Sequence, residues 1–402
     1  MKVLICGGGC AGPSLAFWLS RSGHDVTIVE RLPNLRASGA QIDLRGQGIE
    51  VVRRMGLLEK VREKRVNEAG VEFVDRNGSV IAGVMANTSG QGAQSLTSEY
   101  EIMRGDLVNI LYGATKDNVK YIFGTAVESF EQDDEKVTIH FSNGQTDTFD
   151  ILVGADGQGS RIRKAILPPD APDPCHRLGV HAAYWIVPRD ETDSNMRKSY
   201  LSPGRRWIMR RTHNSTETQA YFIVRDDSPE VSSLHRAPID TQKGFWKQRF
   251  SDAGWQSKRF IDGMDTASNF YSHEAIQVYL DEWYKNRVVL LGDAAYCLSF
   301  FSGMGTTGAL IGAYILAGEI NKSPNDPTQA FVSYQKQMTP FVEGARSIVP
   351  TMVKLSLLDS QWAINLLLFV FKLITRLRIL ELATKFSTDE KGDFKMPDYS
   401  DA

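Results

Sequence analysis

A glycine-rich turn between two short apolar runs constrains the fold of this chain more than any other feature. Residues 2–6 form an apolar run typical of a strand buried on both faces, and residues 7–12 match G-x-G-x-x-G. Apolar residues then recur at helical spacing as far as Gly23, and a second strand over 25–29 ends in Glu30. This order predicts a βαβ unit that binds a dinucleotide.

Each part of the turn has a physical task. Gly7 permits the tight turn, Gly9 lets the backbone approach a pyrophosphate, and Gly12 lets helix and strand pack closely. Free N–H groups at the helix start attract the phosphate charge. Glu30, which comes 18 positions after Gly12, can accept hydrogen bonds from a ribose diol. The motif itself does not distinguish NAD from FAD.

Two further glycine–aspartate signatures follow later in the chain. One is a buried strand from residue 150 that closes in a turn at Asp156 and Gly157, and the other is a strand from residue 287 that ends in Gly292-Asp293. After the second, a helix rich in small residues opens over 303–306 and continues to 318. Its small side chains would let the helix backbone lie close to a flat, bulky group.

The three motifs, in this order and spacing, resemble those of the class A flavoprotein aromatic hydroxylases, which include p-hydroxybenzoate hydroxylase and the tetracycline-inactivating monooxygenases. The resemblance covers about residues 1–320 and implies non-covalently bound FAD. It implies that the glycine loop takes the pyrophosphate, Glu30 the adenosine ribose and Asp293 the ribityl chain. It also implies that Arg104 reaches the flavin from a neighbouring helix. The cofactor-binding residues predicted in this way are Gly7, Gly9, Gly12, Glu30, Arg31, Arg104, Asp156, Gly157, Asp293, Gly303, Gly305 and Thr306.

The resemblance also implies a reaction. NAD(P)H would reduce the flavin where FAD meets the nicotinamide at Asp156-Gly157, O2 would add to give a C4a-hydroperoxide, and the distal oxygen would pass to an aromatic or polycyclic substrate, such as a polyketide or an antibiotic. Because the cofactor carries this chemistry, no catalytic side chain is predicted. Three alternatives remain: Baeyer–Villiger oxygenation, epoxidation, and a flavin-binding protein without oxygenase turnover.

This chain departs from the family pattern at three positions. Tyr296 and Phe300 stand where the family usually has histidine and proline, and Gly312 stands where an aspartate is often found. Phe300 and Phe301 are predicted to form an apolar, bulky wall facing the flavin. These changes leave FAD binding intact and alter the expected substrate geometry.

Residues 176–275 alternate as strands do, with one helix expected near 243–250, and predict an open sheet on the substrate side of the flavin. The candidate substrate-binding residues are Tyr184, Arg210, Tyr221 and Phe300. Strand alternation places Arg210 and Arg211 on opposite faces. Asn77-Gly78 and Asn143-Gly144 predict hairpins with type I′ turns.

The predicted fold is α/β: a Rossmann-like FAD-binding domain interleaved with a β-sheet substrate domain, plus C-terminal helices. The FAD-binding domain takes residues 1–70, 100–175 and 276–325, and the substrate domain takes 71–99 and 176–275. A helical region at 326–390 and a flexible tail at 391–402 complete the chain.

An apolar helix is expected over residues 362–380, interrupted by Lys372, Arg376 and Arg378. Its charge-free core is shorter than a membrane span requires. We expect it to pack against the flavin domain with a basic outer edge; peripheral membrane contact and helix-mediated dimerisation are alternatives. The chain is therefore expected to be a monomer or a homodimer, without a transmembrane segment.

Composition mainly excludes partners. The chain has 46 Lys and Arg against 48 Asp and Glu, so no basic excess favours nucleic acid. Four scattered cysteines do not make a disulfide framework, and Cys175, His176 and His181 lack a second ligand cluster for a metal. Glycines interrupt the first apolar run, unlike a signal peptide, so a cytoplasmic location is expected.

Overall fold

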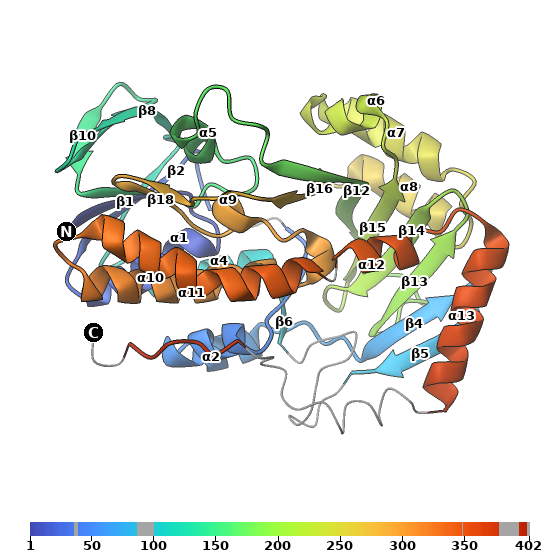
Figure 1. Ribbon diagram of the computed structural model, residues 1–402. Helices are drawn as coiled ribbons and strands as arrows, with labels where there is room; N and C mark the ends of the chain where they lie inside the picture. The colour runs from blue at the N-terminus through green and yellow to red at the C-terminus, as the bar shows by residue number, and fades with distance from the viewer. Residues whose placement is uncertain (36–38, 87–99, 348, 378–393, 400–402) are drawn as a thin grey trace.

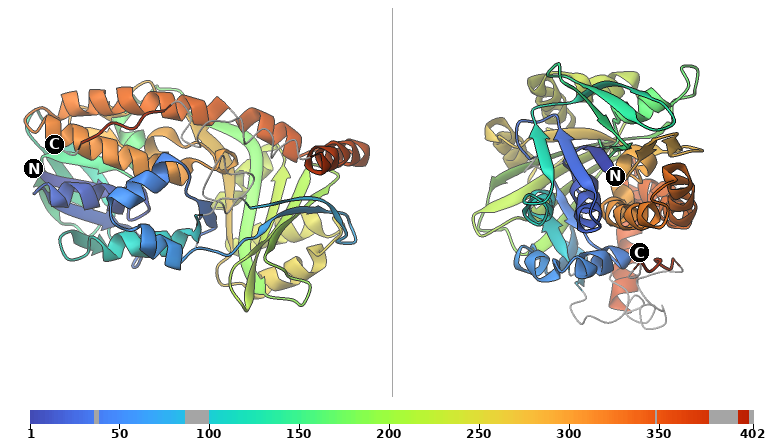
Figure 2. Two further views of the ribbon diagram at one scale, coloured as in Figure 1. Left: turned by 90° about the horizontal axis from the view of Figure 1, so that it is seen from below. Right: turned by 90° about the vertical axis from the view of Figure 1, so that its left-hand side faces the viewer.

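The computed structural model describes residues 1–35, 39–86, 100–347, 349–377 and 394–399. The predicted boundary at residue 99, the end of the expected 362–380 helix and part of the predicted tail lie outside these residues. Two sheets occupy opposite ends of the molecule, and the long helices α10 (Gly305–Lys322) and α11 (Pro327–Ser347) lie side by side along the first (Figures 1 and 2).

The first sheet has six strands in the order β17-β18-β11-β1-β2-β7, and only β17 runs antiparallel to its neighbour. These strands are β1 (Lys2–Cys6), β2 (Asp25–Glu30), β7 (Lys120–Phe123), β11 (Ile151–Gly154), β17 (Tyr284–Lys285) and β18 (Val288–Leu290). The expected βαβ unit is present, because α1 (Ala11–Arg21) joins β1 to β2. α1 packs on α10, and α10 packs on α2 (Gln47–Arg54).

Smaller elements surround this sheet. They are the pair β3 (Gln41–Asp43) and β6 (Glu101–Met103), a three-stranded sheet of β8 (Val127–Gln132), β9 (Val137–Phe141) and β10 (Thr146–Phe149), and the helices α3 (Leu58–Glu63), α4 (Arg104–Gly113), α5 (Arg161–Ile166) and α9 (Asp293–Tyr296).

The second sheet has seven strands in the order β16-β12-β15-β14-β13-β4-β5, antiparallel except where β13 meets β4. They are β4 (Gly70–Val74), β5 (Val80–Met85), β12 (Cys175–Pro188), β13 (Met196–Ser202), β14 (Arg206–Thr212), β15 (Glu217–Arg225) and β16 (Tyr271–Val278). One face buries Trp185 and Phe222 against Phe250 and Phe260 of the covering helices. The other face meets Met103 of β6 through Tyr184 and Tyr221.

The region between β15 and β16 contains more helix than the sequence predicts. In place of a single helix near 243–250, it holds α6 (Pro229–Ser233), a 3-10 turn (Leu234–Arg236), α7 (Ile239–Phe250) and α8 (Ser257–Thr266). α8 buries only Ser257, Phe260 and Met264, so its apolar pattern is too sparse to identify from the sequence.

Both predicted hairpins are present, but their turns are not type I′. Only the glycine of each pair has a positive φ, +87° at Gly78 and +81° at Gly144, whereas type I′ needs positive φ at both central residues. In the first turn the Gly78 N–H donates to the Asp75 carbonyl, and the Asp75 carboxylate accepts from the backbone N–H of Asn77 and Ser79. The second turn has the same backbone pattern, with the Gly144 N–H donating to the Phe141 carbonyl, so each loop is one residue longer than a type I′ hairpin.

The C-terminal helices differ in part from expectation. α11 is followed by α12 (Val349–Ser356) and α13 (Gln361–Arg376), and α13 packs on β5 and β13 rather than on the flavin-binding part (Figure 1). Its contacts include an edge-to-face pair of Phe371 and Phe73, 5.1 Å between centroids. No single helix within the described residues is long and apolar enough to cross a membrane, although α11–α12 and α13 together, as a bent pair, meet these criteria.

The predicted flexible tail is ordered where it is described. Tyr399 is buried, its hydroxyl donates to Glu319 at 2.5 Å, and its ring fills the space beside Gly318, where a Cβ would lie 2.3 Å away. Residues 394–399 thus pack against α10 beside α2 (Figures 1 and 2).

Candidate functional site

The glycine loop crosses the carboxyl ends of β1 and β11. Gly7 has φ +120°, and a Cβ there would lie 2.4 Å from the carbonyl oxygen of Ala155. A Cβ on Gly12 would lie 2.1 Å from the Gly7 carbonyl oxygen, which is closer than real Cβ atoms approach. Neither position has room for a side chain, and the start of α1 is therefore held directly against β1.

Gly9 has a different environment. A Cβ there would meet only one group within 4 Å, the Arg104 guanidinium, at 3.3 Å from Nη2. No side chain caps the N-terminus of α1. The outer side of the loop therefore presents uncapped N–H groups beside a fixed cation, which suits an anionic ligand.

Glu30 organises the loop from the end of β2. One carboxylate oxygen accepts from the Gly8 N–H at 2.8 Å and the other accepts from the Leu32 N–H at 2.9 Å. Each oxygen keeps a second lone pair that can accept a hydrogen bond from a hydroxyl group. Arg31, the next residue, is exposed.

Arg104 is the first residue of α4 and joins three separate segments. Its guanidinium lies by Gly9, its aliphatic stem lies by Gly39, where a Cβ would be 3.1 Å from Cδ, and its charge acts on Asp293. Enclosure by protein raises the pKa of the Asp293 carboxyl, and Arg104 opposes the rise. The side chain of Asp293 is nevertheless exposed to solvent. Protein therefore surrounds this carboxylate on most sides and leaves one side open.

The start of α10 faces Asp293. A Cβ on Gly305 would lie 3.8 Å from Asp293 Oδ1, and no atom lies within 4 Å of the Cβ position of Gly303, which has φ +64°. Met304 provides no side-chain cap, and Thr306 is half-buried. A second uncapped helix N-terminus thus lies beside the exposed carboxylate.

Asp156 caps α5. Its carboxylate accepts from Ser160 Oγ at 2.5 Å and from the Arg161 N–H at 2.7 Å, and Gly157 follows with φ +82°. The sequence reasoning missed Arg163, which is buried and donates to the carbonyls of Ala294, at 2.9 Å, and Gln158, at 2.5 Å. Arg163 therefore ties the Asp156 turn to α9; three basic residues in one short helix gave no sign of which one is buried.

Two of the three departures from the family pattern are coupled in space. The Tyr296 hydroxyl donates to the Gly308 carbonyl of α10 at 3.3 Å and accepts from Tyr334 at 3.3 Å. A Cβ on Gly312 would lie 2.0 Å from this hydroxyl. Tyr296 therefore occupies the space that a side chain at position 312 would need, and the missing side chain leaves room for the Tyr296 hydroxyl against α10.

A row of aromatic rings leads away from α10 across the seven-stranded sheet. Phe301 stacks on Phe300 with 4.4 Å between centroids, Phe300 meets His273 edge to face at 5.4 Å, and His273 stacks on Tyr271 at 5.1 Å. Tyr271 pairs across the strands with Tyr184, whose ring lies 5.0 Å from that of Tyr221. Phe300 is 40% exposed, whereas Phe301, Tyr184 and Tyr221 are buried.

The predicted substrate residues divide between the two faces of this sheet. Tyr184 and Tyr221 share the face that meets β6. Arg210 lies on the opposite face, as strand alternation requires, and its buried guanidinium pairs with Asp193 at 2.8 Å. Asp193 also pairs with Arg259 at 2.7 Å. This placement does not support substrate contact by Arg210, because internal partners occupy both terminal nitrogens of its buried guanidinium.

A buried polar network on the Tyr221 face was not predicted. Arg211 donates to both carboxylate oxygens of Glu68, at 3.0 and 2.8 Å, and also contacts Glu101. Gln41 bonds Glu101 and accepts from Gln219 at 2.7 Å. The two carboxylates hold the pKa of Arg211 well above its ordinary value, although burial opposes this. These residues come from distant segments, so only the folded chain brings them together.

Two histidines form a neutral chain behind the sheet. His181 Nε2 donates to the Asp226 carbonyl at 3.0 Å, so its Nδ1 accepts from His235 at 2.8 Å, and His235 in turn accepts from Ser272 at 3.1 Å. Burial lowers the pKa of His235 to about 3, and the neighbouring His181 makes the second largest contribution to this shift.

No three metal-ligating side chains come together among the residues the structure describes.

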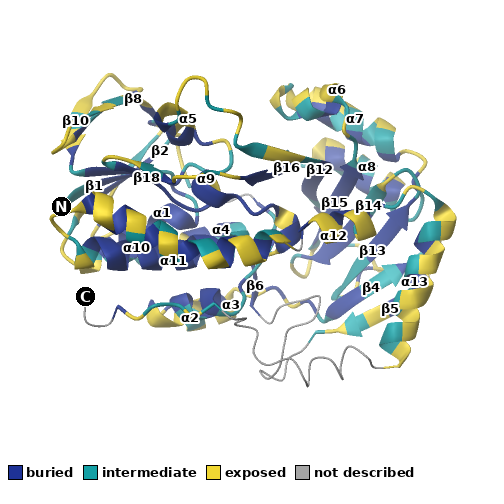
Figure 3. Ribbon diagram, viewed as in Figure 1, coloured by how far each residue is buried: buried dark blue, intermediate teal, exposed yellow. Residues whose placement is uncertain are grey.

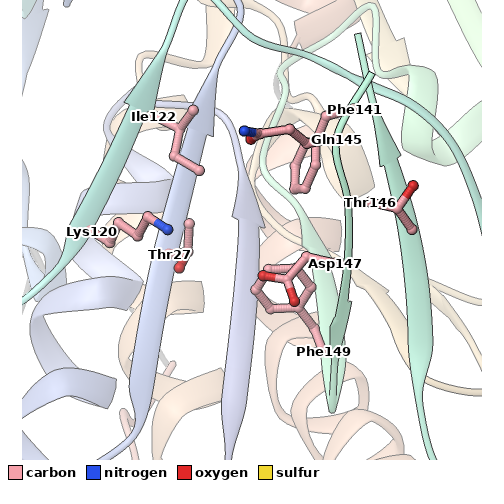
Figure 4. Close-up of a pocket in the computed structure, with 8 residues that line it drawn as sticks. All are labelled: Thr27, Lys120, Ile122, Phe141, Gln145, Thr146, Asp147 and Phe149. Carbon is pink, nitrogen blue, oxygen red and sulfur yellow. The ribbon is translucent and has the colours of Figure 1, made fainter. Parts of the chain in front are cut away.

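A cavity of about 300 Å³ lies away from these residues, between the six-stranded and three-stranded sheets (Figure 4). Its polar lining consists of Thr27, Lys120, Gln145, Thr146 and Asp147, and Asp147 already pairs with Lys2 at 2.6 Å. The cavity therefore lacks the converging polar groups of a specific site.

The candidate site is the region bounded by the glycine loop, Arg104, Asp293 and the start of α10.

Comparison with known proteins identifies the family of this chain. A family model described as a FAD binding domain matches residues 1–345. The FAD-dependent monooxygenase asL4 of Sarocladium schorii is 37% identical over 429 aligned residues, covering 99% of this chain and 98% of that protein. The flavin-dependent monooxygenase eupH of Phoma sp is 39% identical, covering 91% and 90%. The structure of the tetracycline destructase Tet(55) matches with a TM-score of 0.83 at 29% identity, covering 99% and 98%.

Proposed function

Because the chain belongs to the FAD-binding-domain family of class A flavin monooxygenases, we propose that it uses NAD(P)H and O2 to hydroxylate an aromatic or polycyclic small molecule. The relatives fit this substrate class, since one is named a tetracycline destructase. The row of aromatic rings from Phe301 to Tyr221 carries the proposal within this chain, because it begins at the loop before α10 and crosses the sheet face.

The residues present fit FAD. Gly303 provides backbone that no side chain covers, and Gly9 lies beside the Arg104 guanidinium. The N-termini of α1 and α10 are uncapped, and Asp293 offers an exposed carboxylate between them. The glycine loop and Arg104 would hold the pyrophosphate, Glu30 the adenosine ribose and Asp293 the ribityl hydroxyls. When bound, FAD would supply redox chemistry and oxygen activation.

The chain's own residues would position the reactants and exclude water. Phe300, exposed in front of Phe301, would form an apolar wall where the cofactor and substrate regions meet. Tyr184 and Tyr221 would present ring faces to a flat substrate, and the Tyr221 hydroxyl is already fixed because it donates to Gln219 at 2.7 Å. Asp156 and Gly157 would border the nicotinamide.

The reaction is tested by substrate-stimulated NAD(P)H oxidation with equal O2 uptake, using a panel of phenols, quinones and polyketides. We expect a product that gains one oxygen with its ring intact. A lactone or a ring-opened product would mean Baeyer–Villiger oxygenation, and an epoxide would mean alkene oxygenation. A yellow protein that consumes no NAD(P)H with any ligand would contradict the proposal.

The cofactor assignment is tested at Asp293. Asp293→Ala should purify with little or no FAD, because the carboxylate faces the open side of the site. The control is Asp240→Ala, an exposed aspartate in the first turn of α7. Flavin content, read from the visible absorbance of the folded protein, should fall in the first variant and stay at wild-type level in the second. Full occupancy in Asp293→Ala would refute the role of this carboxylate.

A further inference from the structure

α13 has two apolar faces, and the fold uses only one of them. Ile364 and Leu368 are buried against Leu201 of β13, next to Phe73 of β4. The other face carries six large exposed apolar side chains, between 44% and 70% accessible: Trp362, Leu366, Phe369, Val370, Leu373 and Leu377. Exposed residues mark this outer side in Figure 3.

The spacing of these six residues makes them a single surface. At 100° per residue they fall within a sector of about 100°, so they form one stripe along the whole helix. A helix that only covers a sheet has polar residues on its outer side. Scattered exposed apolar residues need no explanation, whereas a contiguous stripe marks an interaction site.

The charges beside the stripe have one sign. Lys372 and Arg376 are exposed and four residues apart, and they flank the stripe on one side. Lys354 lies on α12, the preceding helix, which also exposes Met352 and Leu355. From residue 349 to 377 the sequence contains these three basic residues and a single acidic one, Asp359. This local excess stands out in a chain whose formal net charge is −2.

A basic flank beside an apolar stripe restricts the choice of partner. If two copies of this face met, each would bring basic groups toward the other, and α13 has no acidic residue to pair with them. An anionic lipid surface satisfies both features, since acyl chains accept the apolar side chains and phosphates pair with Lys372 and Arg376. Trp362 at the start of the helix suits the boundary between headgroups and acyl chains.

We propose that α13 docks this protein on an anionic membrane surface, with the helix lying in the plane of the interface. The outer stripe enters the headgroup region while Ile364 and Leu368 stay packed on the sheet. Docking would therefore not require α13 to leave the protein. It would place the seven-stranded sheet beside the bilayer.

The test uses the full-length, FAD-loaded protein and vesicle flotation. One set of vesicles is phosphatidylcholine alone, and the other contains about 30 mol % phosphatidylglycerol to supply negative charge. We expect flotation with the anionic vesicles that weakens as salt rises, and little flotation with the neutral ones. Trp362 fluorescence, taken as the difference between wild type and Trp362→Phe, should shift to the blue on binding.

Two variants separate the apolar and the charged contributions. Leu366→Gln/Phe369→Gln/Leu373→Gln should abolish flotation, whereas Ile239→Gln, an exposed apolar residue on α7, should not. Lys372→Gln/Arg376→Gln should weaken binding to anionic vesicles by roughly 25-fold at low salt, because each basic residue near such a surface contributes about fivefold. Lys336→Gln, exposed on α11, is the matched control. Circular dichroism and flavin absorbance confirm that each variant is folded.

Several results would overturn the proposal. One is no flotation of wild type with anionic vesicles at low salt, and another is equal flotation of wild type and the triple variant. Equal binding to neutral and anionic vesicles would remove the role of Lys372 and Arg376. A dimer that the triple variant disrupts, without lipid binding by wild type, would mean that the stripe meets a second copy.

Discussion

The two sheets of this molecule use their residues in opposite ways. At the six-stranded sheet the site is formed largely by what is missing: glycines without side chains, helix ends without caps, and one carboxylate left open at Asp293. At the seven-stranded sheet charged side chains are abundant, but they form ion pairs with other residues of the protein. Arg210 pairs with Asp193 on one face, and Arg211 pairs with Glu68 on the other. We therefore expect the first region to bind a charged cofactor and the second to recognise a ligand mainly by its shape.

This contrast between the two sheets predicts that the glycine loop tolerates substitution less than any other part of the chain. Gly12→Ala places a Cβ 2.1 Å from a backbone carbonyl that cannot rotate away, so we expect a loss of about 5 kcal/mol or more in the free energy of unfolding and no retained FAD. In contrast, Gly244→Ala in α7 meets nothing within 4 Å and should stabilise the helix by about 0.5–1 kcal/mol. Urea denaturation and flavin content measure both. Equal behaviour of the two variants would contradict the special role of the loop.

The next largest effect concerns the buried arginines of the seven-stranded sheet. Arg211→Met leaves Glu68 and Glu101 buried without their cation and should lower the free energy of unfolding by about 3–5 kcal/mol. Arg210→Met should lower it by only about 1–3 kcal/mol, because Asp193 keeps its pair with Arg259. Urea denaturation measures both losses. A change in the KM of Arg210→Met without loss of stability would show that Arg210 binds substrate after all.

The coupling of Tyr296 and Gly312 is tested by a double-mutant cycle. Gly312→Ala should cost about 1–3 kcal/mol of stability, because its Cβ would lie 2.0 Å from the Tyr296 hydroxyl. In a Tyr296→Phe background the nearest ring carbon is 3.3 Å away, so the same change should cost much less. Tyr296→Phe alone should cost about 0.5–1.5 kcal/mol for its hydrogen bonds. Additive effects would show that the two positions are independent.

A further effect is a dependence of stability on pH, which comes from His235 beside His181. The folded pKa of His235 is lowered to about 3 from an ordinary value of 6.5, so the unfolded chain binds more protons between these values. Its contribution to stability is complete above about pH 6.5 and is lost as pH falls toward about 3. His235→Gln should therefore reduce the slope of unfolding free energy against pH between pH 7 and 5. An unchanged slope would mean that the pKa of His235 does not differ between the folded and the unfolded chain.

The sequence was most informative where function depends on local backbone geometry. Gly7 and Gly12 could be identified because a tight turn and a close helix contact demand glycine at fixed spacing. Asp293 and Gly305 were predicted from the resemblance to the class A hydroxylases, and their roles toward FAD stay predictions. Arg163 could not be identified, because its partners Ala294 and Gln158 are known only once α5 and α9 are packed together.

The sequence by itself determined the α/β fold, the glycine loop and the opposite faces of Arg210 and Arg211, since each follows from residues that are neighbours in the chain. Only the tertiary structure decided that Arg210 is paired with Asp193, that Tyr296 occupies the space beside Gly312, and that α13 covers β5 and leaves an apolar stripe open. The reason is that burial and pairing depend on segments far apart in sequence, and no local period records which of them will meet.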